Sequence, residues 1–500
     1  IYVSADGGVD GRKTELSKIP ARSYINDVEA SNHNADTVFA VADAHKLGDY
    51  SPYVFISTNQ GRSWQSIAGD LPKDTIVWVI KQDHVDENLL FVGTEYGVYF
   101  SPNKGDNWIK LDAGLPPIAF RDIELHTRDH DLVGGTFGRG IYVLDDYSPL
   151  RNISSVLKDE TNALFPVRDT WWYVPNEPMQ AKGMPGQGTT KFATDNPPFG
   201  AVFTYHLSDI PKTAKAQRQQ TEKDLNAKQA DIPFPGWQQL LQESREDEPQ
   251  VLLLVSDASG EPVRWLKGAT AEGLHRTSWD LKRSPPNPIN FNQPAFKPPW
   301  VGDAEGPMVA PGQYQVSLYL AHDGKLTAQG DPQAFTVKPV ASDRPQAELE
   351  AVAAFQAKTS ELSRQVASAG RKLSEAENRL SHMQAALLQT PKASQQLFAD
   401  LKQLDNQLAD LQHRLNGDAV RYQLNESTTP SIRSRVGTVA YGHWGTTQMP
   451  TQTQQQDIEI AENDFQQFRQ DLTTYWQNLE SYEAKLEEAG APYTPGRDLD

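Results

Sequence analysis

The residues best suited to chemistry lie between positions 120 and 146. Asp122 is the strongest single candidate for hydrolysis of a glycosidic bond, because that reaction uses carboxylates on both sides of the scissile bond. We expect its partner to lie outside this chain. The sequence contains neither a G-x-S-x-G nucleophile elbow nor an H-E-x-x-H zinc motif. Asp122 is therefore a catalytic candidate only if the protein is a glycoside hydrolase.

Arg139 and Asp145 form a second candidate site, this time for ligand binding. Arg139 lies in the glycine-rich stretch 135–140, and Asp145 and Asp146 follow shortly after it. Glycine permits close approach of a ligand to the backbone, and an arginine there could bind a carboxylate. The alternative is an Arg–Asp pair that only stabilises the last repeat.

His126, Asp129, His130 and Asp131 raise the question of a metal site. Aligned on the repeat described below, they occupy the same polar turn as residues 86–88. A solvated hairpin turn explains them, and no further fixed ligand is apparent. We therefore expect no metal and no cofactor.

These candidates belong to a repeat that fills residues 1–150. Four similar segments, 1–6, 54–59, 98–103 and 141–146, recur at intervals of about 43 to 53 residues, each with an apolar run that ends in a polar turn. This is the period of a β-propeller, in which each blade has about four strands.

Two copies carry a sharper motif at the end of the strand. It combines a serine, an asparagine, a glycine and a tryptophan at fixed spacing, and a partial copy begins at Ser4. The asparagine can cap backbone N–H groups, the glycine can take a positive φ, and the tryptophan can anchor the turn. The two full copies are Ser57, Asn59, Gly61 and Trp64, and Ser101, Asn103, Gly105 and Trp108.

This motif matches the Asp-box, or bacterial neuraminidase (BNR) repeat. Segments 120–124, 135–146 and 196–202 resemble the C-terminal portion of bacterial exported propeller proteins of the sortilin-like or "glycosyl hydrolase" type. The resemblance implies that residues 1–150 are the last blades of a propeller, with the Asp-boxes on its outer rim. It also implies a secreted or periplasmic location.

The fold class we expect is mainly β with an α tail. Residues 151–195 read as a wrapping linker in which Trp171, Trp172 and Tyr173 are buried. An immunoglobulin-like β-sandwich module follows at 196–340, with a helical insertion at about 209–248. Heptad-spaced leucines at 345–490 predict an antiparallel, coiled-coil bundle of long helices, and the connection from about 417 to 454 reads as a structured loop.

Composition excludes several classes of partner. The net charge of -18 disfavours nucleic acid, and no apolar run is long enough to span a membrane. Cysteine is absent, which excludes disulfides and thiol chemistry. The segment 1–4 reads as the middle of a strand, so we expect an N-terminal portion of the same protein to complete the propeller.

Two functions stay open. The first is a non-catalytic binding scaffold for protein, peptide or glycan, with the helices serving assembly and a homo-oligomer left open. The second is a glycoside hydrolase, sialidase- or xyloglucanase-like, whose site is completed by the missing blades. We lean towards the binding protein, because no complete catalytic set can be assembled from these residues.

Overall fold

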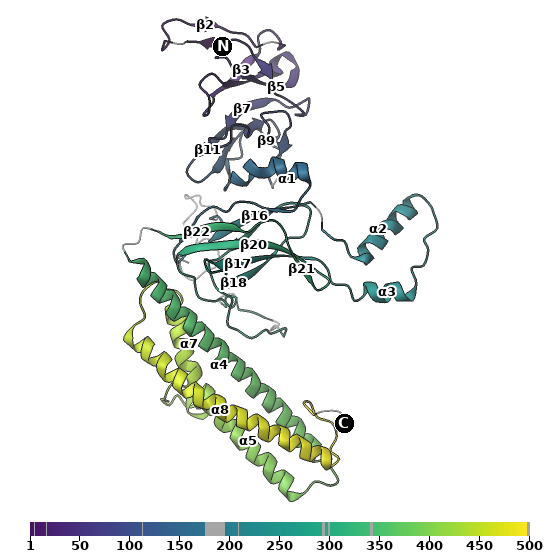
Figure 1. Cartoon of the computed structure of the whole chain (residues 1–500), viewed down its shortest axis with the longest axis vertical. Helices are drawn as coiled ribbons and strands as arrows, with labels where there is room; N and C mark the ends of the chain where they lie inside the picture. Colours follow the sequence, from purple (N-terminus) through teal and green to yellow (C-terminus); the bar gives the residue numbers. More distant parts are fainter. Residues whose placement is uncertain are drawn as a thin grey trace.

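The computed structural model describes residues 1–497 apart from positions 5, 17, 113, 209, 176–195, 293–295, 299–300 and 341–343. Three parts follow one another along the long axis (Figure 1): β-sheets at the N-terminal end, further sheets in the middle, and long helices at the C-terminal end. The chain is thus mixed β with several sheets and a helical C-terminal region. No helix in the described part is both long enough and apolar enough to cross a membrane.

Three antiparallel sheets, here called sheets one, two and three, make up most of residues 1–150. A short strand pair, β1 (Tyr2–Val3) and β2 (Arg12–Lys13), precedes them. Sheet one contains β3 (Tyr24–Ala30), β4 (Val38–Ala44), β5 (Asp49–Ser57) and β6 (Gln65–Ser66). Sheet two contains β7 (Val77–Gln82), β8 (Leu90–Thr94), β9 (Gly97–Ser101) and β10 (Ile109–Lys110). Sheet three contains β11 (Phe120–His126), β12 (Asp131–Thr136) and β13 (Ile141–Leu144).

The turn that carries the serine–asparagine–glycine motif has the same hydrogen bonds in each copy. The Ser57 hydroxyl accepts the Gly61 N–H at 2.9 Å, and the Asn59 side-chain oxygen accepts the Ser63 N–H at 2.9 Å. The copies that begin at Ser4 and Ser101 form the same two bonds. The repeated motif therefore corresponds to a repeated local structure, including its incomplete first copy.

The two tryptophans of the motif tie each turn to the preceding copy. The Trp108 indole N–H donates to the Ile67 carbonyl at 3.0 Å, and Trp108 is buried. The Trp64 indole N–H donates to the Thr14 hydroxyl at 3.1 Å, but Trp64 is only half-buried. The two tryptophans therefore hold equivalent places in the repeat, but only Trp108 is buried.

A glycine-to-alanine pair tests this turn. Gly105 has φ +94°, and a Cβ there would lie 2.7 Å from the Ile67 Cβ and carbonyl oxygen. We expect Gly105→Ala to lower the free energy of unfolding by roughly 1–3 kcal/mol, measured by urea denaturation. Gly61→Ala is the matched control, with φ +67° and 3.0 Å to a movable Val3 methyl. An equal loss in both variants would contradict the role of the Ile67 contact.

The middle part consists of two sheets that share one core. The smaller has the order β14 (Ala163–Leu164), β16 (Ala201–Leu207), β19 (Gly273–Trp279). The larger has the order β15 (Thr170–Trp172), β22 (Gln333–Pro339), β20 (Gly312–His322), β17 (Gln250–Asp257), β18 (Pro262–Gly268), with β21 (Lys325–Ala328) beside β20. Phe203 and Trp279 from the first sheet and Leu253 and Val316 from the second are fully buried together.

The segment expected to be a linker is structured where the chain is described. It begins with the short helices η2 (Ser148–Asn152) and α1 (Ile153–Asp159) and then supplies β14 and β15 to the two middle sheets. Trp172 is buried, whereas Trp171 and Tyr173 are largely exposed, so the expected burial of all three is wrong. Strand alternation explains this, because neighbouring residues of a strand point to opposite faces. Residues 176–195 lie outside the described part.

An arm of two helices leaves the middle part (Figure 1). It contains α2 (Ala214–Ala227) and α3 (Trp237–Glu243), where the sequence predicted a helical insertion. Arg218 links the two helices through a hydrogen bond to Glu243 at 2.8 Å. The helices therefore hold each other while they extend away from the sheets.

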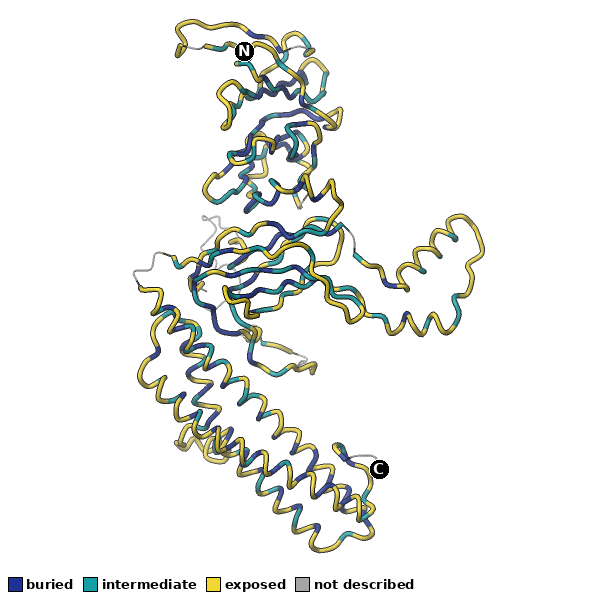
Figure 2. The backbone as a smooth tube through the Cα atoms, in the orientation of Figure 1, coloured by how far each residue is buried: buried dark blue, intermediate teal, exposed yellow. Residues whose placement is uncertain are grey.

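The C-terminal region contains α4 (Gln346–Leu387), α5 (Gln395–Asn416), α6 (Ala419–Gln423), α7 (Ile432–His443) and α8 (Gln452–Glu488). α4, α5, α7 and α8 share one apolar core, and their outer faces are exposed (Figure 2). α7 lies in the connection that we expected to be a loop, and it buries Ile432, Val436 and Val439.

Candidate functional site

The first strand of each N-terminal sheet contains a β-bulge at the same place. The extra residue is Asn26 in β3, Trp78 in β7 and Arg121 in β11. A bulge turns a side chain away from the regular alternation, and such irregularities are common beside functional sites. Three equivalent bulges therefore present three side chains of different chemistry along the row of first strands.

Two of these bulge residues stack on each other. The Arg121 guanidinium lies over the Trp78 ring, 3.4 Å from its centroid, and 5.4 Å from the centroid of Phe137. The Trp78 indole N–H donates to the Glu95 carboxylate at 2.9 Å, and Arg121 Nη2 lies 3.9 Å from the same oxygen. We refer to Trp78, Glu95, Arg121 and Phe137 as the Trp78–Arg121 cluster.

Hairpin turns from all three sheets position this cluster. Glu95 follows β8, and its N–H donates to the Ile76 carbonyl at 3.0 Å. Phe137 follows β12, and its N–H donates to the Ala119 carbonyl at 2.9 Å. His45 follows β4 and meets the Trp78 ring edge-on, with 5.8 Å between ring centroids. The backbone therefore fixes the residues around the stacked arginine.

The cluster leaves hydrogen-bonding capacity facing solvent. The contact from Arg121 to Glu95 is too long for a hydrogen bond, and 42% of the Arg121 side chain is exposed. Phe137 is 71% exposed beside it. A guanidinium held flat by stacking can bind a carboxylate with two hydrogen bonds, and an exposed ring can pack on an apolar ligand face. The arrangement suits binding rather than bond cleavage.

Asp122, the catalytic candidate, directly follows the bulge on β11. Its side chain is exposed and accepts the N–H of Ile123 at 3.0 Å. It pairs across the sheet with Gly135, which pairs with Ile141, so these residues share one face. Glu124 lies on the same face two residues further along the strand.

Arg139 and Asp145 are placed at opposite ends of β13. Arg139 lies in the hairpin turn before the strand, where its N–H donates to the Thr136 hydroxyl at 3.2 Å. At the other end, the carbonyls of Asp145 and Asp146 accept hydrogen bonds from Arg276 of β19 at 2.6 and 2.5 Å. Asp145 therefore lies at the contact with the middle part, where burial and the nearby Asp131 raise its pKa.

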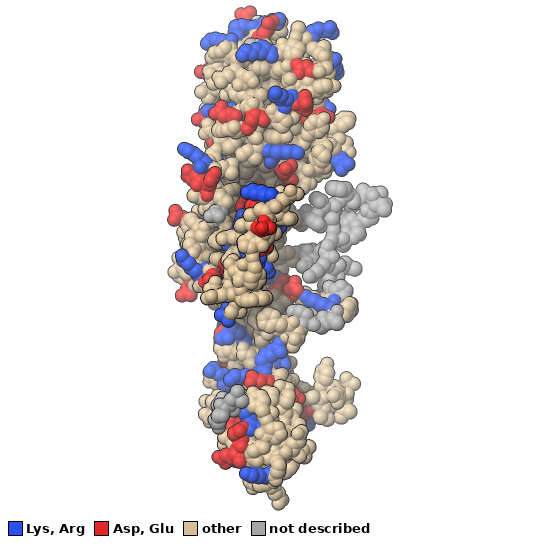
Figure 3. Space-filling view, turned by 90° about the vertical axis from the view of Figure 1, so that its right-hand side faces the viewer, with Lys and Arg blue, Asp and Glu red and all other residues tan. Residues whose placement is uncertain are grey.

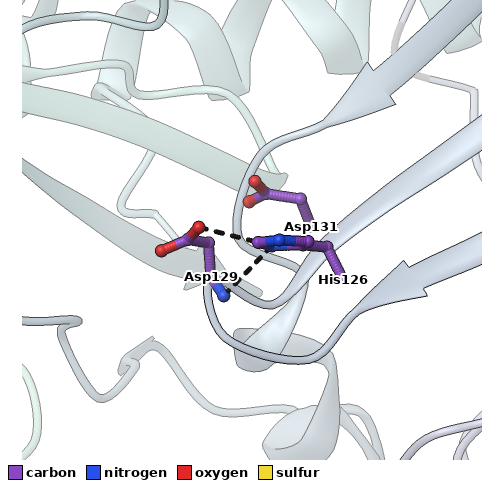
Figure 4. A group of neighbouring side chains, drawn as sticks. All are labelled: His126, Asp129 and Asp131. Atoms are coloured by element: carbon purple, nitrogen blue, oxygen red, sulfur yellow. Dashed lines mark hydrogen bonds and ion pairs between the residues drawn. The ribbon is translucent and has the colours of Figure 1, made fainter.

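His126, Asp129 and Asp131 do converge on one turn (Figure 4). One potential ligand atom from each lies within 4.8 Å of the others. Asp129, however, accepts a hydrogen bond from Arg128 at 2.7 Å, and Asp131 accepts the Asp146 N–H at 2.9 Å. Because both carboxylates already accept hydrogen bonds from neighbouring groups, we interpret the three residues as a hydrogen-bonded turn.

A buried charged group near this turn was missed. Asp83 follows β7, and its carboxylate accepts hydrogen bonds from Arg151 at 2.8 and 2.9 Å and from the Tyr147 hydroxyl at 2.8 Å. Burial alone would raise the pKa of Asp83, but the Arg151 and backbone hydrogen bonds outweigh it and lower the pKa to about 2. His130 lies against Arg151, not with His126. No local motif marks Asp83, because Arg151 and Tyr147 are more than 60 residues away in the sequence.

The Trp78–Arg121 cluster was missed as well, although a signal existed. Asn26, Trp78 and Arg121 recur at intervals within the range of the repeat, and all three interrupt an otherwise alternating strand. Aligning the copies one residue at a time would have shown that this position changes chemistry from copy to copy. The distribution of charged residues does not mark the cluster, because Lys, Arg, Asp and Glu are interspersed on the face shown in Figure 3.

No family model matches this chain. No curated protein matches it either. Among solved structures, one similarity is to an ancestral GH74 enzyme, at 26% identity and a TM-score of 0.20, covering 23% of this chain and 16% of that one. Another is to the extracellular domain of a hybrid two-component system from B. thetaiotaomicron, at 10% identity and a TM-score of 0.16, covering 63% and 36%. Each similarity thus spans only a minor part of the other protein.

Proposed function

We propose that this chain is a binding protein that works outside the cytoplasm, and that its Trp78–Arg121 cluster binds an acidic glycan. The observation that carries the proposal is the Arg121 guanidinium, stacked 3.4 Å from the Trp78 centroid while 42% of the Arg121 side chain stays exposed. Sugar rings offer an apolar face for Phe137, and a uronic or sialic acid adds the carboxylate that suits arginine. The location outside the cytoplasm rests on the resemblance of the repeat to exported proteins.

Replacing Arg121 with alanine tests the site. Loss of charge-assisted hydrogen bonds costs about 1.5–3 kcal/mol, so we expect affinity for oligogalacturonides or sialyllactose to fall roughly 10- to 150-fold in calorimetric titrations. Arg128→Ala is the matched control, since Arg128 is 81% exposed beyond the other end of β11 and pairs with Asp129. Equal binding of acidic and neutral oligosaccharides by the unaltered protein would refute the proposal.

We place this site in a larger architecture that also remains a proposal. Residues 1–150 are the last blades of an Asp-box propeller, residues 196–340 an immunoglobulin-like module, and residues 345–490 an antiparallel bundle. The repeated turn hydrogen bonds support the first assignment. The shared cores of the two middle sheets and of the long helices support the others. An N-terminal portion of the same protein would complete the ring, and the helices would serve assembly.

A glycoside hydrolase is the second candidate, and one carboxyl group favours it. Glu29 on β3 is half-buried, and burial raises its pKa although Lys81 donates to it at 2.9 Å. Asp27 and Glu124 contribute to this increase, so several carboxyl groups lie near one another. An acid of raised pKa opposite an ionised carboxylate is the arrangement that hydrolysis needs. Release of reducing sugar that disappears in both Glu29→Gln and Asp122→Asn would establish the enzyme.

A further inference from the structure

The Trp78–Arg121 cluster is built from two positions that recur in sheets one, two and three. The first position is the bulge residue of the first strand. The residue before each bulge pairs across the sheet with Ala42, Thr94 or Thr136, and the next residue along the chain is the second position. Each sheet thus contributes one pair of side chains: Asn26 with Asp43, Trp78 with Glu95, and Arg121 with Phe137. Sheet one therefore has its own pair where the other two sheets form the cluster.

The Asp43 carboxylate is buried and holds a histidine. Asp43 is 2% exposed, and it accepts the backbone N–H of His45 at 3.2 Å and also contacts His45 Nδ1. A carboxylate only accepts hydrogen bonds, so this contact fixes a proton on Nδ1 and leaves Nε2 as an acceptor. Among the described residues, Nε2 of His45 has no hydrogen-bond partner, and 33% of this side chain is exposed. The pair therefore presents one free acceptor atom.

Trp78 connects this acceptor to the stacked arginine. The His45 ring meets Trp78 edge-on with 5.8 Å between ring centroids, and the Arg121 guanidinium lies 3.4 Å from the same Trp78 centroid. His45 comes from sheet one and Arg121 from sheet three, so a single ring of sheet two contacts both. A ligand bound to Arg121 is therefore one aromatic ring away from His45.

The two ends of this row suit different groups of a ligand. Arg121 offers a positive charge for a carboxylate. Asp43 and Glu95 place carboxylates at the second position of sheets one and two, and His45 offers an acceptor. A second carboxylate of the ligand would meet like charge and no donor there, whereas a hydroxyl can donate to Nε2. The chemistry next to the acidic sugar is thus that of a neutral sugar.

We propose that the binding site extends onto the Asp43–His45 pair and takes an oligosaccharide in which one acidic sugar is linked to a neutral sugar. The carboxylate lies at Arg121, and a hydroxyl of the neutral sugar donates to His45 Nε2. Asp43 is a positioning residue, because it acts through His45. This inference rests on the glycan-binding function proposed above, and it excludes a uniformly acidic chain as the preferred ligand.

Calorimetric titrations of the unaltered 1–500 chain at pH 8 test the ligand class. One series compares galacturonic acid, digalacturonic acid and galacturonosyl-rhamnose, and a second compares sialic acid, disialic acid and sialyllactose. We expect the mixed compound of the series that binds to be roughly 2- to 12-fold tighter than its monosaccharide, as one added hydrogen bond provides. A mixed compound that binds no tighter than the monosaccharide or the uniformly acidic compound would overturn the inference alone. Absence of binding in both series would overturn the glycan site, and this inference with it.

Replacing His45 with phenylalanine tests the residue itself. His45→Phe keeps a ring beside Trp78 but removes Nε2, so the advantage of the mixed compound should disappear while the affinity for the monosaccharide is unchanged. Arg121→Ala, in contrast, should weaken both compounds. His126→Phe is the matched control, since His126 also pairs with an aspartate, Asp129 at 3.3 Å, at the opposite end of β11.

Two results would contradict the role given to His45. One is an unchanged advantage of the mixed compound in His45→Phe, and the other is an equal loss for the mixed compound and the monosaccharide, which indicates a structural role. Urea denaturation checks the fold of this variant, because it leaves the buried Asp43 without its histidine. The sugar series on the unaltered protein does not depend on any variant and tests the ligand class in either case.

Discussion

Replacing Glu483 with alanine is expected to lower the free energy of unfolding of the helical region by about 3–5 kcal/mol. Glu483 of α8 accepts two hydrogen bonds from Arg379 of α4, at 2.8 and 2.5 Å, and both side chains are over 90% buried. Burial raises the pKa of Glu483 even though Arg379 lowers it, so the buried pair is costly to desolvate. Removing Glu483 leaves the buried Arg379 guanidinium with Glu375, which is 59% exposed and 3.6 Å away, in place of its two hydrogen bonds to a buried carboxylate.

Among the described residues, the remaining contacts of Arg379 include no second buried carboxylate. Arg379 also donates to the Gly496 carbonyl at 3.1 Å and lies 5.0 Å from the Trp476 ring centroid. Urea denaturation followed by circular dichroism at 222 nm measures the loss. The double variant Arg379→Met with Glu483→Leu is the control, and we expect it to unfold close to the unaltered protein, because apolar residues often replace a buried pair without cost. A double variant as unstable as the single one would refute this explanation.

Replacing Asp83 with alanine is expected to cost a similar amount, about 3–5 kcal/mol, in the N-terminal sheets. Asp83 is fully buried and holds both Arg151 and Tyr147, which follow sheet three, against the end of β7. Without Asp83, the Arg151 guanidinium would stay largely buried but would lose the carboxylate to which it now donates. Tryptophan fluorescence during urea denaturation reports the loss, because Trp78 and Trp108 lie in the same sheets.

The lowered pKa of Asp83 predicts that the protein loses stability in acid. The pKa of Asp83 is about 2 in the folded protein, against 3.8 for an unperturbed aspartate, so the folded form favours the ionised carboxylate. This stabilisation, roughly 2 kcal/mol, is present above about pH 4 and is lost as the pH falls towards 2. Asp83→Asn should remove that part of the pH dependence. Asp129→Asn is the control, since its arginine partner is exposed, and we expect about 0–1 kcal/mol. Identical acid profiles for both variants would contradict this role.

The sequence predicted regular elements better than irregular ones. The segments beginning at Ile1, Val54, Val98 and Ile141 all include strands, because a period of two and a repeat of fixed length leave a clear pattern. The leucine seams predicted α4, α5 and α8 for the same reason. α7 was missed because its apolar residues are few and two glycines, Gly437 and Gly442, interrupt it.

The site was harder to predict than the strands. A bulge adds one residue without changing composition, so Trp78 and Arg121 look like ordinary strand residues until the register is known. Asp122 was identified from its residue type alone, and it is exposed beside the bulge. Its neighbours Gly135 and Ile141 could not be identified in this way, because they lie beside it through pairing across strands. Arg139 and Asp145 are close in sequence and yet separated by the length of β13. Sequence proximity fails here because an extended strand separates its two ends.

The joint between sheet three and the middle part has a consequence for how the protein could diverge. Arg276 binds the carbonyls of Asp145 and Asp146, and Arg168 binds the carbonyl of Asp129. Every amino acid has a carbonyl, so this joint does not depend on which side chains stand at 129, 145 and 146. Positions 129 and 145 can therefore change, and with them the chemistry of the loop surface, while the two arginines and Asp146, whose carboxylate accepts hydrogen bonds from Ser148, must stay. Side chains on the loop side of this contact can thus vary, while the arginines on the other side cannot.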